Sequence, residues 1–238
     1  MLVIRGTAGY PGFTLDTDIT VRNETVAIVG DNGTGKTTLL KIAAGLQRLS
    51  CGVVRLDGDV LDDPQTDTFV EPHRRHVSLL FQDPLLFSHL SVVDNVAFGL
   101  RRAGWDRQRA RDRSLIELEK LGAKHLASRR PDTLSGGQAQ RVALARALVR
   151  DPKMILLDEP FSSLDRTSRK EFREMLKESF GSLSIPRLIV THDDADIAVL
   201  CQREITLERA EPNEGTAKAP APVERTTGFE PATLTLAR

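Results

Sequence analysis

A glycine-rich stretch at 30–38, which holds a lysine and three threonines, directly follows an apolar run at 25–29. Triphosphate oxygens need many donors at short range, and glycines let several backbone N–H groups converge on them. Lys36 adds a positive charge near the β- and γ-phosphates, and the Thr37 hydroxyl suits Mg²⁺. The residues of this phosphate-binding loop are Gly30, Asp31, Asn32, Gly33, Thr34, Gly35, Lys36, Thr37 and Thr38.

The segment that follows the loop predicts a helix beginning at about Lys36. The positive end of its dipole would face the same anion, so that loop and helix act together. The alternative is an ordinary glycine-rich turn between a strand and a helix. The buried strand before the loop and the helix after it favour the phosphate site.

Two adjacent carboxylates, Asp158 and Glu159, follow an apolar strand predicted at 154–157. Ligands of open α/β sheets bind at the carboxyl ends of the strands. Asp158 is suited to hold Mg²⁺ directly or through water, and Glu159 to polarise the water that attacks the γ-phosphorus. The alternative is an exposed acidic pair in a turn, which the phosphate loop disfavours.

A pentapeptide at 134–138, Leu-Ser-Gly-Gly-Gln, precedes Asp158 and opens another predicted helix, whose free N–H groups suit an anion. The pentapeptide and the continuation at 140–147 resemble the signature of the ATP-binding cassette ATPases. The resemblance runs from about residue 2 to 207 and implies an ATPase that uses ATP and Mg²⁺. It assigns nucleotide contacts to Ser135, Gly136, Gly137 and Gln138.

The same resemblance gives roles to three further polar residues. Gln82 matches the glutamine that contacts Mg²⁺ or the attacking water, and His192 matches the histidine that contacts the γ-phosphate. Asp165 matches a residue of the loop that lies across the dimer interface. The alternatives are a surface glutamine and a structural histidine.

The family stacks adenine on an aromatic side chain before the phosphate loop. Tyr10 and Phe13 are both candidates, and the spacing does not choose between them. Phe13 equally suits the core, and Arg5 is a weaker stacking partner.

Positioning these residues requires an α/β fold. Alternating strands and helices predict a P-loop NTPase core with a mainly parallel sheet, an N-terminal antiparallel β lobe and an inserted helical lobe. A loop is expected at 62–72. The expected strands are 2–4, 13–21, 25–29, 52–58, 77–81, 154–157 and 188–191, and the expected helices 91 onward, 106–121, 136–149, 169–180 and 194–200.

Composition limits the partners of this 238-residue chain. Its 33 basic residues balance 33 acidic residues, so no global field favours nucleic acid. The two cysteines lack metal or disulfide spacing. No apolar run approaches the roughly 18 residues of a membrane span, so a membrane link is expected through a partner.

The chain divides into an ATPase domain at 1–208, with its helical insert at about 84–133, and a tail at 209–238. The polar composition of the tail predicts disorder. The peptide at 228–231 can also be encoded by a nucleotide sequence similar to the complement of the T-arm of transfer-RNA genes, so read-through into such a gene is an alternative origin of the tail.

The resemblance implies a head-to-tail homodimer, or a paired cassette subunit, around two Mg-ATP. It further implies an integral membrane permease, a solute-binding protein acting indirectly, and a position at the cytoplasmic face of the membrane. The Q-loop region favours an importer of molybdate or a related oxyanion. Thiamine, iron or other small-solute importers, an exporter subunit and a non-transport cassette ATPase are alternatives. The expected docking residues are Leu85, Leu86, Phe87 and Leu90, and the alternative is that they pack within the helical lobe itself.

Overall fold

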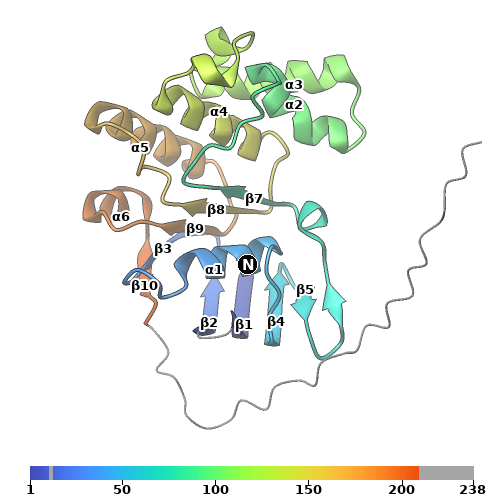
Figure 1. Ribbon diagram of the computed structural model, residues 1–238, viewed down its shortest axis with the longest axis vertical. Helices are drawn as coiled ribbons and strands as arrows, with labels where there is room; N and C mark the ends of the chain where they lie inside the picture. Colours follow the sequence, from blue (N-terminus) through green and yellow to red (C-terminus); the bar gives the residue numbers. More distant parts are fainter. Residues whose placement is uncertain (11–12, 209–238) are drawn as a thin grey trace, which may run out of the picture.

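The computed structural model describes residues 1–10 and 13–208 (Figure 1). It contains two five-stranded sheets, one antiparallel and one parallel, with helices packed on them. This confirms the predicted mixed α/β class. The tail predicted at 209–238, with the read-through interpretation, lies outside the described residues.

The antiparallel sheet is built from the N-terminal third of the chain. Its second strand alternates between exposed and buried residues because one face packs on the core. Its strands, in sheet order, are β2 (Phe13–Val21), β1 (Leu2–Tyr10), β4 (Cys51–Leu56), β5 (Asp59–Asp63) and β6 (Thr68–Phe69).

The prediction of a loop at 62–72 is partly wrong. Asp62 and Asp63 end β5 and pair with Phe69 and Thr68 of β6. The Asp62 side chain is fully buried, and its carboxylate accepts a hydrogen bond from the Leu49 amide over 2.9 Å. A buried, hydrogen-bonded aspartate thus stands in a strand whose acidic composition resembles that of a loop.

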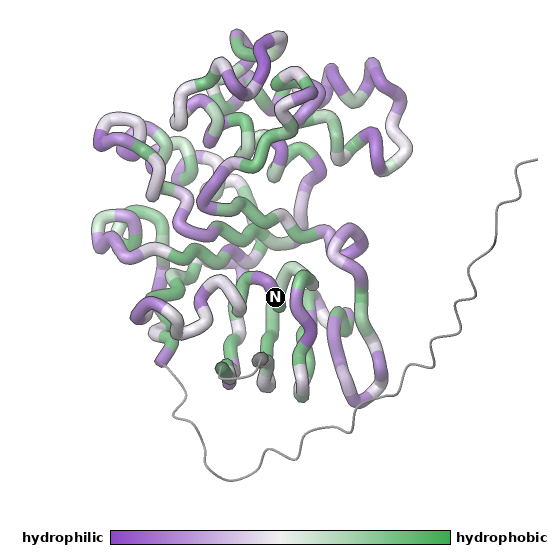
Figure 2. The backbone as a smooth tube through the Cα atoms, in the orientation of Figure 1, coloured by the Kyte–Doolittle hydropathy of each residue, from purple (hydrophilic) through white to green (hydrophobic). Residues whose placement is uncertain are grey.

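The parallel sheet has strand residues that are buried on both faces. In β8, Ile155 and Leu157 contact one core, whereas Met154 and Leu156 contact the other. Figure 2 shows apolar residues concentrated in these strands and polar residues on the outer turns of the helices. The strands, in sheet order, are β10 (Arg203–Thr206), β3 (Thr25–Val29), β9 (Arg187–Val190), β8 (Met154–Asp158) and β7 (Val77–Leu80).

Helix α1 (Lys36–Ala44) lies between the two sheets and contributes to the core that they share (Figure 1). The buried Arg75 ties its last turn to the antiparallel sheet. The Arg75 guanidinium donates to the Ile42 and Ala43 carbonyls over 2.9 and 3.2 Å, and to the Leu61 and Val70 carbonyls over 3.1 and 2.7 Å.

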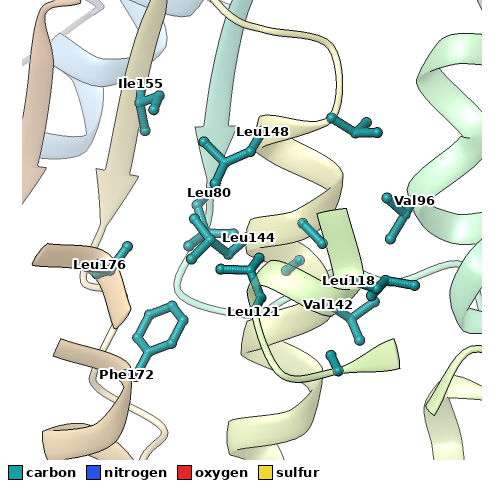
Figure 3. Packing of buried hydrophobic residues seen from close by; sticks show 14 of the residues in the cluster. Leu80, Val96, Leu118, Leu121, Val142, Leu144, Leu148, Ile155, Phe172 and Leu176 are labelled. Atoms are coloured by element: carbon teal, nitrogen blue, oxygen red, sulfur yellow. The ribbon is translucent and has the colours of Figure 1, made fainter. Parts of the chain in front are cut away.

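The remaining helices cover the other face of the parallel sheet. Ser91 and Asp106 cap α2 (Val92–Arg102) and α3 (Arg107–Lys120), the two helices expected from 91 and from about 106. The others are α4 (Gly136–Leu148), α5 (Arg166–Gly181) and α6 (Asp194–Leu200). Figure 3 shows Leu144 and Leu148 of α4 beside Leu80 of β7. Within 1–10 and 13–208, no helix has the length and apolar character needed to cross a membrane.

Candidate nucleotide-binding site

The phosphate loop connects β3 to α1, which begins at Lys36 as predicted. Gly35 caps the helix with φ of 99°, a left-handed conformation that glycine adopts without steric cost. A Cβ atom at Gly35 would also lie 2.8 Å from the ring of Phe13. The glycine is therefore required both by the turn and by the close approach of an aromatic ring.

The loop closes over its own carbonyl groups. The Lys36 ammonium donates to the carbonyls of Gly30 and Asp31 over 2.7 and 2.8 Å. The buried Thr34 hydroxyl donates to the Asp31 carbonyl over 3.0 Å. These bonds hold the positively charged Lys36 ammonium inside the loop, at the N-terminus of α1. An anion is favoured at this position.

Asp158, at the end of β8, lies beside this helix start. Its Oδ1 accepts from the Thr37 hydroxyl over 3.3 Å. Burial raises the pKa of Asp158 and the charge of Glu159 raises it further, whereas the bond from Thr37 lowers it. A carboxylate that is costly to ionise by itself is one that a bound cation would stabilise.

The hydroxyl oxygen of Thr37 and the carboxylate oxygens of Asp158 are suitable ligands for Mg²⁺. In phosphate sites, Mg²⁺ takes one or two protein ligands and completes its octahedron with phosphate oxygens and water. Among the residues that the structure describes, no three His, Cys, Asp or Glu side chains form a metal-binding cluster. The donor set thus fits a metal bound together with a nucleotide.

Glu159 adopts a strained backbone conformation, with φ of 45°. Its amide donates to the Val190 carbonyl over 3.0 Å, which ties the end of β8 to the neighbouring β9. Non-glycine residues with positive φ cluster at functional sites, where the surrounding structure compensates the strain.

Glu159 and the phosphate loop line one cavity of about 200 Å³. Phe13 lines it too, so the structure brings one of the two aromatic candidates to the loop. The side chain of the other, Tyr10, is outside the described part of the chain. The lining residues are Phe13, Asn32, Gly33, Gly35, Lys36, Thr37, Thr38, Glu159 and Val190.

Gln82 and His192 lie at the same edge of the parallel sheet but outside the lining of this cavity. Each follows the last residue of its strand by two positions, after Leu80 of β7 and Val190 of β9. Both side chains are exposed. Their predicted contacts with nucleotide stay predictions.

The signature residues form the N-terminus of α4. The Ser135 hydroxyl accepts from the Gln138 amide over 3.3 Å, and the Gln138 side chain accepts from the Ser135 amide over 3.1 Å. Ser135, Gly137 and Gln138 line a second cavity of about 230 Å³, which shares no lining residue with the phosphate-loop cavity. Gly136 is exposed beside them. Within one subunit, the two sets of nucleotide-binding candidates therefore remain apart.

Asp165 has a local partner set. It caps α5 by accepting from the Thr167 and Ser168 amides over 2.9 and 3.0 Å and from the Ser168 hydroxyl over 2.6 Å. These bonds, that of the Ser168 hydroxyl foremost, lower the pKa of Asp165. The carboxylate is committed to its own helix, so a nucleotide contact from this loop stays a prediction.

Sequence reasoning missed two side chains of α4 that support the site. Arg146 donates to the carbonyls of Pro84 and Leu85 over 2.7 and 2.9 Å, which holds the segment after Gln82. Gln140 is buried and donates to the Pro160 carbonyl, next to Glu159, over 3.0 Å. The available signal was two long polar side chains among the alanine, leucine and valine residues of the helix predicted at 136–149.

A parallel sheet, a phosphate loop between its strand β3 and helix α1, and an acidic pair at the end of β8 define the chain as a P-loop NTPase. Residues 16–162 match the ABC transporter family, and the chain belongs to it.

Curated relatives support the family on sequence. The molybdenum import ATP-binding protein ModC of Pseudomonas aeruginosa is 39% identical over 230 residues, which cover 94% of this chain and 61% of that protein. ModC of Mycobacterium tuberculosis is 44% identical over 199 residues, which cover 82% of this chain and 54% of that protein. The chain thus spans little more than half the length of these relatives.

Solved structures with a similar fold also support membership of the ABC transporter family. CbiO1 from Clostridium perfringens, described as part of the transporter complex cbiONQ, gives a TM-score of 0.75 at 31% identity, covering 87% of this chain and 84% of that one. The bacterial cassette MJ0796, solved as a dimer, gives 0.73 at 27% identity, covering 87% and 94%. A further structure of MJ0796 is bound to ADP and phosphate.

Proposed function

We propose that this chain is the ATP-hydrolysing subunit of an importer for molybdate or a related oxyanion. One observation carries the catalytic part: the phosphate loop and Glu159 line the same cavity, with Asp158 hydrogen-bonded to Thr37 beside it. The similarity to ModC proteins supports the substrate class.

The residues divide the work by their chemistry. The loop amides and Lys36 bind and orient the phosphates, and Phe13 stacks on the adenine. Thr37, Asp158 and Gln82 would hold Mg²⁺, which would neutralise part of the phosphate charge. Glu159 accepts the proton of the attacking water, and His192 contacts the γ-phosphate.

The proposed assembly contains two copies of the chain, or one copy and a related cassette. Ser135, Gly136, Gly137 and Gln138 of one subunit complete the site formed by the phosphate loop of the other. An integral membrane permease binds the pair at the cytoplasmic face of the membrane, and a solute-binding protein delivers the oxyanion to the permease.

Purified protein tests the catalytic part of this proposal. We expect Mg²⁺-dependent release of phosphate from ATP, lost in Lys36→Ala because the loop then lacks its cation. Uptake of radioactive molybdate by vesicles that hold the chain together with its permease tests the substrate. ATP hydrolysis stimulated by another solute and not by molybdate would contradict the substrate class.

The docking surface for the permease includes the exposed Leu85. Of the four apolar residues predicted here, Leu86 packs on the core and Phe87 is half-buried, with its ring 4.6 Å from that of Phe98. The packing alternative therefore holds for Leu86 and partly for Phe87. Leu85 is 58% exposed, which leaves most of its side chain available to a partner.

A groove of about 460 Å³ continues this surface. It combines apolar rings with several guanidinium groups, a composition typical of interface anchors. Its lining residues are His89, Leu90, Asp94, Phe98, Arg101, Arg102, Trp105 and Arg107.

Leu85→Asp is expected to reduce permease-stimulated ATP hydrolysis at least ten-fold, since loss of an anchor typically costs roughly 2 kcal/mol of association. Leu85 has φ of 46°, a conformation that aspartate tolerates, so the isolated subunit should keep its melting temperature and basal rate. Leu46→Asp is the matched control, because Leu46 is 53% exposed and follows α1. Equal stimulation of the two variants would contradict the docking proposal.

A further inference from the structure

A buried carboxylate joins α5 to α6. Asp196 has no exposed surface. Its Oδ2 accepts from Arg169 Nη2 over 2.6 Å and its Oδ1 from Arg173 Nε over 2.7 Å. Arg169 also forms an ion pair with Asp193 over 3.0 Å. Two guanidinium groups and two carboxylates thus balance in charge within one cluster.

The cluster reaches the segment that carries His192. The Thr191 hydroxyl, 4% exposed as a residue, donates to Asp196 Oδ2 over 3.2 Å and accepts from the Asp193 amide over 3.3 Å. Both neighbours of His192 are therefore bonded into the cluster. Among the described residues, no hydrogen bond or ion pair involves the exposed His192 ring itself.

The cluster also contacts the turn after Glu159. The Arg169 guanidinium lies over the ring of the buried Phe161, 5.5 Å from its centroid. Arg169 is in the first turn of α5, the helix that Asp165 caps. One group of side chains thus links three segments that carry proposed site residues.

We propose that Asp196, with Arg169 and Thr191, is a positioning device that holds the His192 segment in fixed register with the Glu159 turn. Thr191 connects Asp196 to the segment of His192. Arg169 connects Asp196 to the turn after Glu159 through its contact with Phe161. Without the Thr191 hydroxyl, the segment 191–193 loses the bond from the Asp193 amide and the side-chain bond to Asp196, and His192 loses its fixed direction. This inference rests on the proposed ATPase function, because that function assigns His192 the contact with the γ-phosphate.

Thr191→Val tests the link, whereas Asp196→Asn would remove the buried carboxylate that pairs with Arg169 and Arg173 and would endanger folding. Valine keeps the shape of threonine and removes only the hydroxyl. We expect kcat for ATP to fall about ten-fold with KM unchanged, because displaced catalytic groups lose rate while the phosphate loop still binds. Thr191→Ser, which restores the hydroxyl, should recover most of the rate.

His192→Ala provides the decisive comparison. If Thr191 acts through His192, adding Thr191→Val to His192→Ala should lower kcat by less than about two-fold, since residues that act as one unit are not additive. Thr25→Val is the matched control: Thr25 is also buried, and its hydroxyl accepts from Arg187 over 2.8 Å at the start of β3, where that strand enters the sheet. It should keep kcat.

A readout without nucleotide separates this inference from the proposed function. In ¹³C-histidine NMR spectra, the His192 signal, identified by its loss in His192→Ala, should shift or broaden in Thr191→Val and stay unchanged in Thr25→Val. A wild-type chain without ATPase activity would refute the proposed function, and the NMR comparison would still decide the positioning. An unchanged His192 signal, or additive effects on kcat, would overturn it.

Discussion

Replacing Glu159 by glutamine is expected to slow ATP hydrolysis by about 10²- to 10⁴-fold while leaving ATP binding intact. Glutamine keeps the shape of the side chain but cannot accept the proton of the attacking water. The phosphate loop, which supplies most of the phosphate contacts, is unchanged. The variant should therefore bind ATP without consuming it and remain as an ATP-bound dimer.

Single-turnover phosphate release measures the rate, and size-exclusion chromatography with and without ATP measures the dimer. Glu174→Gln is the matched control, because Glu174 is an exposed glutamate on α5 that lines neither nucleotide-site cavity. Its rate should equal that of the wild type. Near-normal turnover by Glu159→Gln would refute the general-base role.

Combining Lys36→Ala and Ser135→Arg in one subunit is expected to abolish both sites of a dimer with a wild-type partner. The signature residues and the phosphate loop of one chain line separate cavities. If they meet only across the dimer, one site lacks its lysine and the other is blocked by the new arginine. No intact site remains.

Placing the two substitutions in different subunits is the matched control. Both defects then fall in one composite site, and the other site is complete. Differently tagged subunits allow each mixed dimer to be purified and its ATP turnover compared. If the doubly substituted subunit with its wild-type partner retained one competent site, the cross-subunit arrangement would be wrong.

Local patterns predicted the framework of the site because chemistry there depends on neighbours in sequence. The glycine spacing at 30–38 predicted a loop followed by a helix, and α1 does begin at Lys36. The apolar run before Asp158 announced a buried strand, which β8 confirms. The starts of the helices that follow Ser91 and Asp106 could be predicted for the same reason.

Contacts between distant segments were not readable. The Asp62 carboxylate accepts a hydrogen bond from the Leu49 amide. The Asp196 carboxylate accepts hydrogen bonds from two arginines that lie 27 and 23 residues earlier in the chain. A single sequence shows that such residues are charged but gives no sign that they are buried and paired. Asp62 therefore suggested a loop, and Asp196 received no role.

The aromatic next to the phosphate loop shows an intermediate case. Spacing left Tyr10 and Phe13 equal, whereas the structure places Phe13 against Gly35. The antiparallel pairing of β2 with β1 sets the face of the sheet on which the Phe13 ring lies, whereas the side chain of Tyr10 lies outside the described part of the chain. Register between strands is a tertiary property that the composition of either strand does not encode.

The bonds of Arg75 have a consequence for recombination between relatives. Its guanidinium joins the last turn of α1 to carbonyls of the antiparallel sheet, and α1 itself contributes to the core that both sheets share. The antiparallel lobe is therefore not a transferable module. A chimaera that takes this lobe from another cassette keeps the contact between α1 and the antiparallel sheet only if its residue 75 is an arginine that reaches the same carbonyls.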